Sequence, residues 1–215
     1  MRTVYAPVMD SACPVCSSPL LSTGIDVEPR GSSATPTKVD PRLIPDDEAM
    51  RLEAVRRYEI LDTPRDGSFD RVTSLAAKIF GVPIASVTVV DSDRIWFKSA
   101  FGIDADQIGR DPGLCASAIL SDDITLVPDA RRDPQALNNP LVLGELGLRF
   151  YAGAPLKTAD GYNLGTLNII DREPRELSEV EQSILLDLAQ IVVDELELRL
   201  AARHLYQDLG VPILR

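Results

Sequence analysis

The stretch IASVTVVDSDRIWFKSAFG, residues 84–102, predicts a β-hairpin. In its first half, β-branched and small apolar residues alternate with Ser86 and Thr88, which is the period of a strand with one face toward a core. Residues 91–93, Asp-Ser-Asp, supply the side chains that favour a tight turn. The stretch therefore predicts two antiparallel strands, and the elements around it decide which fold they belong to.

The second strand of this hairpin carries the only tryptophan of the chain. Alternation places Ile95 and Phe97 on one face and Arg94, Trp96 and Lys98 on the other. Two interpretations of Trp96 stay open. It lines a cavity with the two cations near the rim, or it packs beneath a covering loop, since a large aromatic residue is usually part of a core.

Helical and strand patterns surround the hairpin. Apolar residues recur at helical spacing before it, and three further apolar stretches after it have the length and flanking turns of strands. The predicted helices are residues 47–64 and 69–81, and the predicted later strands are residues 123–130, 149–156 and 162–171. A short helix over residues 116–120 and one helical turn within residues 131–147 complete the middle of the chain. This order favours an α+β fold with a helix layer on an antiparallel sheet over a βαβ alternation.

The C-terminal segment predicts a long helix. Ser178 and Glu181 form a capping box, and an apolar stripe continues to about Arg203. Leu185, Val193 and Leu200 widen the stripe beyond what one sheet face requires. We therefore expect a homodimer that forms through the terminal helices.

Composition limits the class of function. The 215 residues contain 22 Lys and Arg against 33 Asp and Glu, a net charge of −11. This sign argues against non-specific binding to nucleic acid or to an anionic membrane. The chain shows no apolar run of membrane-spanning length and no secretion signal, so we expect a cytoplasmic protein. A single histidine, His204, excludes a metal site built from several histidines of one chain.

The N-terminal part predicts a flexible tail over residues 1–45, because it is rich in Pro, Ser, Thr and Gly and has no sustained period. Cys13 and Cys16 within it have the spacing of half a zinc site, but no second pair follows. Either this is a degenerate segment or a site shared across a dimer. We expect the ordered domain at residues 46–203 and a short tail at residues 204–215.

These residues resemble a GAF domain, the sensory module of bacterial sensor kinases and cyclases. The resemblance covers about residues 47–203, and the stretches that carry it are residues 58–102, 126–142, 149–156 and 164–189. It implies a GAF/PAS-like central antiparallel β-sheet with the terminal helices on one face. It also implies a pocket on the other face, covered by the loops between residues 102 and 149.

The resemblance places four residues in the candidate pocket, namely Trp96, Cys115, Arg149 and Tyr151. Arg149 either binds a carboxylate or phosphate or pairs with an acidic turn. Cys115 is either a small buried hydrophobic residue or a reactive thiol. The aspartates of residues 91–111 are explained by turns, so we predict no metal site, and the sequence identifies no cofactor.

Four activities of GAF proteins can be compared with the residues. The residues after Cys115 do not suit a bilin, His204 lies too far along the chain for haem, and most of the cyclic-nucleotide pattern is missing. Free methionine-R-sulfoxide reduction needs a second thiol beside Cys115, and only the tail offers one. We therefore expect a stand-alone sensory or regulatory module without catalysis, which binds an unidentified small ligand or a signalling partner protein. The alternatives are a thiol-dependent reductase that uses Cys115 and a dimerisation module without ligand.

Overall fold

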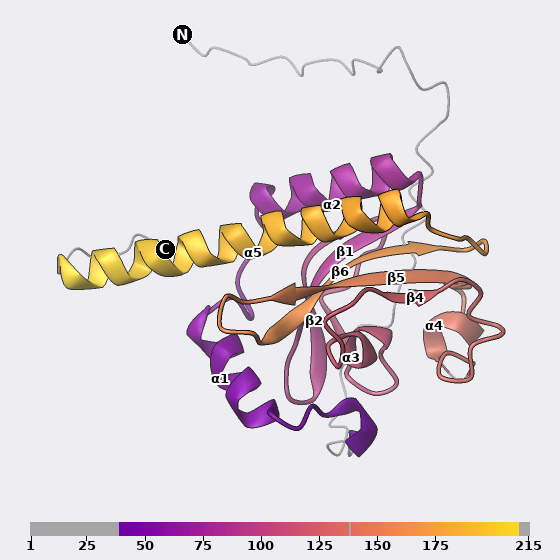
Figure 1. The fold of residues 1–215 in the computed structure, drawn as a ribbon, viewed down its shortest axis with the longest axis horizontal. Helices are drawn as coiled ribbons and strands as arrows, with labels where there is room; N and C mark the ends of the chain where they lie inside the picture. Colours follow the sequence, from indigo (N-terminus) through magenta and orange to yellow (C-terminus); the bar gives the residue numbers. More distant parts are fainter. Residues whose placement is uncertain (1–38, 138, 211–215) are drawn as a thin grey trace, which may run out of the picture.

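A six-stranded antiparallel sheet forms the centre of the computed structural model, which describes residues 39–137 and 139–210 (Figure 1). The strand order across the sheet is β3-β2-β1-β6-β5-β4. The strands are β1 (Ile84–Val90), β2 (Arg94–Phe101), β3 (Gln107–Gly109), β4 (Thr125–Val127), β5 (Phe150–Lys157) and β6 (Asn163–Asp171). The predicted hairpin is thus confirmed, and β3, a three-residue strand at the sheet edge, is added to it.

Helices cover both faces of the sheet. The helices are α1 (Glu48–Arg57), α2 (Gly67–Phe80), α3 (Leu114–Ala118), α4 (Pro140–Leu143) and α5 (Glu179–Asp208), preceded by a 3-10 helix (Pro41–Leu43). Figure 1 shows α2 and α5 side by side along one face, with α3 and α4 on the opposite side. This arrangement confirms the predicted α+β class. Within the described part of the chain, none of the helices combines the length and apolarity that crossing a membrane requires.

The first helices differ from their predicted bounds. α1 ends at Arg57 rather than at Pro64, because the chain turns through a positive φ of 46° at Glu59. α2 begins after Asp66, whose carboxylate accepts the N–H of Ser68, and ends at Gly81 in the left-handed conformation. The prediction of one helix over residues 47–64 is therefore wrong at its C-terminal end, because residues 58–66 form a non-helical connection between α1 and α2.

The alternation within β2 was predicted correctly, but its two faces were exchanged. Trp96 packs in the core formed with α1, α2 and α5, whereas Ile95 packs in the core on the α3 and α4 side. The β1–β2 register shifts next to Thr88, which pairs with Phe97 while Val87 pairs with Ser99, so Lys98 is an extra residue in the strand. Lys98 is buried and is not at a rim.

The capping box of α5 is confirmed, and the helix continues to Asp208, beyond the predicted end at Arg203. The residues expected to face a second subunit do not do so. Leu185 and Val193 are buried in the core, and Leu200 is half-buried against it. These side chains pack against the protein's own sheet and helices, so they are not a surplus of apolar surface.

Asp66 joins three elements. Its carboxylate accepts Lys98 Nζ of β2 at 2.8 Å and both terminal guanidinium nitrogens of Arg199 of α5 at 2.9 and 3.0 Å. Burial alone would raise the pKa of Asp66, but the hydrogen bonds from Arg199 and Lys98 outweigh it and hold this pKa well below its usual value. A helix cap, a strand and the C-terminal helix are thereby fixed to one carboxylate.

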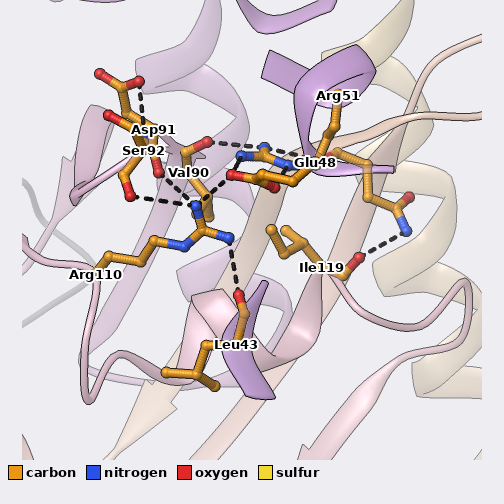
Figure 2. Close-up of polar contacts among 9 residues, drawn as sticks. Leu43, Glu48, Arg51, Val90, Asp91, Ser92, Arg110 and Ile119 are labelled. Carbon is orange, nitrogen blue, oxygen red and sulfur yellow. Dashed lines mark hydrogen bonds and ion pairs between the residues drawn. The ribbon is translucent and has the colours of Figure 1, made fainter. Parts of the chain in front are cut away.

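Figure 2 shows a second ionic junction, formed by one glutamate and two buried arginines. Glu48 of α1 accepts Arg51 Nε at 2.7 Å and is also paired with Arg110, which follows β3. Arg110 donates further to the carbonyl oxygens of Leu43 and Asp91. The junction ties α1 and the chain just before it to the loop that leads into α3.

Candidate functional site

Uncharged polar side chains gather on the sheet face opposite α2 and α5. We define the polar cluster as Ser86, Thr88, Tyr151, Thr166 and Asn168, all at most 1 % exposed. They come from the adjacent strands β1, β6 and β5, at positions that alternate with residues of the helix-side core. Because the surrounding layer is apolar, this cluster is the most distinct chemical feature of the face on which the pocket was expected.

Asn168 is the centre of the polar cluster. Its Oδ1 accepts the hydroxyl of Tyr151 at 2.8 Å, and its Nδ2 donates to Ser86 Oγ at 3.1 Å and Thr88 Oγ1 at 3.2 Å. Thr88 Oγ1 lies 2.9 Å from Thr166 Oγ1. Buried polar groups are costly unless they are hydrogen-bonded, and here each is bonded within a set that has no charge.

Gly153, two residues after Tyr151 in β5, leaves the space that the Tyr151 ring occupies. A Cβ at Gly153 would lie 2.3 Å from the Tyr151 hydroxyl, so only glycine leaves room for the ring. Burial raises the pKa of Tyr151 well above its usual value, with the nearby Cys115 thiol adding to the effect. The phenol therefore stays protonated and remains a donor to Asn168.

Two of the four predicted pocket residues meet at this cluster. Cys115 of α3 lies against it, with Sγ 3.7 Å from Asn168 Oδ1, and Tyr151 belongs to it. Arg149 does not, because its guanidinium donates to the backbone oxygens of Val142 and Leu148. Trp96 lies on the other face, where Lys98 Nζ is 5.9 Å from its ring centre.

The remaining members of the polar cluster were not predicted as site residues. Their signal is present in the sequence, because Ser86 and Thr88 alternate in β1, and Thr166 and Asn168 alternate in β6. Pairing of β1 with β6 places Thr88 opposite Thr166 and Ser86 opposite Asn168. Recognising the cluster requires this pairing, which joins residues about 80 positions apart. Cys13 and Cys16 lie outside the described residues.

An open cleft of about 1100 Å³ lies at the β3 edge of the sheet. Trp96 and Phe97 of β2 line it, together with Arg65 of the α1–α2 connection, the residues around β3 and Leu141 of α4. Trp96 borders this cleft, but from the helix-side core, and Lys98 is buried, so the predicted pocket face with two cations at its rim is not what the structure has. The cleft is separate from the polar cluster. The structure therefore divides the expected pocket into a buried cluster and an edge cleft.

Comparison with known proteins settles the family. The GAF domain family matches residues 64–199, which is more than half of the chain. The chain belongs to the GAF domain family. Its fold and this match agree with a sensory or regulatory module, so that part of the expected function is confirmed at the level of the family.

Solved structures show the same fold. The GAF domain of an Acinetobacter phosphoenolpyruvate-protein phosphotransferase covers 74% of this chain and 98% of its own, with a TM-score of 0.51 and 18% identity. Free methionine-R-sulfoxide reductase from Neisseria meningitidis covers 73% and 94%, with a TM-score of 0.53 and 20% identity. At these identities the likeness concerns the fold alone.

A curated relative corrects one expectation. The GAF domain protein is 38% identical over 168 residues to a cyclic di-GMP phosphodiesterase of Pseudomonas aeruginosa, a match that covers 78% of this chain and 29% of the relative. The expectation of a protein without enzymatic activity is wrong on this finding, because the relative is named as an enzyme. The chain spans less than a third of that relative, whose name describes the whole protein.

Proposed function

We propose that this GAF domain is the regulatory part of an enzyme system that breaks down cyclic di-GMP in the cytoplasm. The proposal is supported by the 38% identity to a phosphodiesterase and by the GAF family match. The polar cluster is the observation that carries the regulatory role. A layer that only had to hold α3 and α4 on the sheet would need no such set of donors and acceptors.

The chemistry of the polar cluster indicates the class of ligand. Its groups are hydroxyls, one phenol and one amide, and Cys115 adds a thiol. A charged ligand would lose its hydration without gaining an opposite charge, because none of the six side chains is ionic. We therefore propose a small uncharged molecule with hydrogen-bonding groups, which would exchange partners with Asn168 and Tyr151 when α3 moves.

We also propose that two copies associate through α2 and α5. Leu75 and Ile79 of α2 and Ile191 and Leu198 of α5 are each 46–66 % exposed. An apolar hollow of about 400 Å³ lies between the two helices and includes Leu75, Ile191 and Leu198. These residues replace the predicted set of Leu185, Val193 and Leu200, and a second copy with the same stripe would cover them.

A chimera tests the regulatory role. The matching segment of the Pseudomonas phosphodiesterase is replaced by this GAF domain, and hydrolysis of cyclic di-GMP is followed by chromatography. We expect Tyr151→Phe to change the rate of the chimera at least threefold, because it removes the donor to Asn168 Oδ1. Tyr162→Phe is the matched control, since Tyr162 contacts Met50 and lies outside the polar cluster.

The outcomes separate the parts of the proposal. Equal rates for both variants and the parent chimera would refute regulation through the polar cluster. Tryptophan fluorescence and thermal unfolding show whether Tyr151→Phe leaves the fold intact. An altered rate with an unaltered fold supports the proposal.

A further inference from the structure

The outer edge of β3 is an unpaired strand edge. β3 pairs with β2 on one side, and among the described residues no strand lies on its other side. The backbone N–H of Phe97 donates to the backbone oxygen of Asp106, and the backbone N–H of Arg110 donates to the backbone oxygen of Asp93. In an antiparallel ladder the residues between such pairs turn their backbone groups outward, so Gln107 and Gly109 present N–H and C=O groups at the free edge. Such an edge accepts a further strand.

The cleft along this edge is acidic. Its lining contains Asp62, Asp104, Asp106 and Asp111 but only one cation, Arg65; of these carboxylates, Asp62 is already paired with Arg94. Asp104 and Asp106 share Arg65 in ion pairs of 3.9 and 3.7 Å, and their side chains are 89 % and 91 % exposed, so one cation serves two carboxylates that a further cation can reach. The edge therefore suits an extended segment that carries basic side chains.

The chain itself arrives at the rim of this cleft. The backbone N–H of Asp40 donates to Asp111 Oδ2 at 3.0 Å, and Asp111 lines the cleft. The 38 residues that precede Val39 lie outside the described residues. The last ten of them, PRGSSATPTK, carry two basic residues, Arg30 and Lys38, and no acidic one.

We propose that residues 29–38 of the same chain occupy the cleft as an extended strand beside β3. Asp40 holds the C-terminal end of this segment next to Asp111, which gives the segment a high effective concentration at the edge. From residue 29 to residue 38 it runs from Asp104 toward Asp111, which is parallel to β3. Its polar sequence contains Pro29 and Pro36, which suits an edge position, where a missing backbone N–H is tolerated.

The proposed segment is long enough to follow the whole edge from Asp104 to Asp111. An extended strand advances about 3.3 Å per residue, so residues 104–111 span at most about 23 Å and residues 30–38 reach about 26 Å. Lys38 would then lie near Asp111, and Arg30 near Asp104 and Asp106. Both ends of the segment thus meet carboxylates. This occupancy does not depend on the proposed regulatory function.

Amide hydrogen exchange in the full-length protein, observed by NMR, tests the proposal. In the wild type we expect the amides of Gln107 and Gly109 to exchange at least tenfold more slowly than in Arg30→Glu/Lys38→Glu. Thermal unfolding of both proteins checks that the fold is retained in the double variant. Arg2→Glu, a charge reversal in the same tail but outside the segment, should leave the exchange unchanged.

Three results would overturn the proposal. The first is exchange of the two amides at the rate of an unprotected chain in the wild type, and the second is equal exchange in the wild type and the double variant. The third is protection that increases with protein concentration, which would show that a second copy occupies the edge.

Discussion

At the scale of single residues, Glu48 is the countercharge of two buried arginines. Two arginine side chains that are 2 % and 1 % exposed share its carboxylate. Burial alone would raise the pKa of Glu48, but the hydrogen bonds from Arg51 and Arg110 outweigh it and lower this pKa. Loss of one partner from a buried ion pair is costly because the remaining charges stay buried without compensation.

We expect Glu48→Gln to lower the free energy of unfolding by about 3 kcal/mol, since it leaves Arg51 and Arg110 without a countercharge. Urea denaturation followed by circular dichroism measures the change. Glu53→Gln is the control, because Glu53 lies on the same helix and is exposed. A loss no greater than that of the control would show that the two arginines are stabilised by backbone carbonyls alone.

The same residues show what the sequence could not reveal. Arg51 sits in a helix that was predicted from its apolar spacing, but its backbone-oxygen partners Val90 on β1 and Asn163 on β6 depend on the tertiary fold. Ser178 and Glu181 lie three residues apart, so their capping box was predictable. Alternation in β2 separated Ile95 from Trp96, yet which face meets the helices is decided by distant residues. Asn168 was missed for the same reason.

At the scale of elements, Asp66 couples the start of α2 to β2 and α5. Its folded-state pKa lies below the usual value of 3.8, so folding favours the charged form. The resulting stabilisation is complete at neutral pH and is lost as the pH falls below about 4, where the unfolded chain takes up the proton first.

Asp66→Asn should therefore remove part of the acid sensitivity of the protein. Urea midpoints measured from pH 7 to pH 3 are expected to fall more steeply for the wild type than for this variant, which starts from a lower midpoint. Asp123→Asn, in an exposed loop, serves as the control and should follow the wild-type curve. Parallel curves for the wild type and Asp66→Asn would argue that Lys98 and Arg199 do not depend on this carboxylate.

At the scale of the whole molecule, the exposed stripe on α2 and α5 predicts the state of assembly. Ile191→Glu/Leu198→Glu introduces like charges on that surface, so we expect a molar mass of two chains for the wild type and one for the variant. Light scattering at equal concentrations measures both. Leu143→Glu, at a residue of α4 that is 72 % exposed, should leave the mass unchanged. A monomeric wild type would refute the dimer.

The last turns of α5 extend beyond the body of the domain (Figure 1). The helix has 30 residues and is therefore about 45 Å long. A continuous helix fixes angular phase as well as distance, since each residue turns the chain by about 100° and advances it by about 1.5 Å. One residue inserted near Arg203 would thus rotate whatever is attached beyond Asp208 by more than a quarter of a turn. Seven inserted residues would nearly restore its original direction.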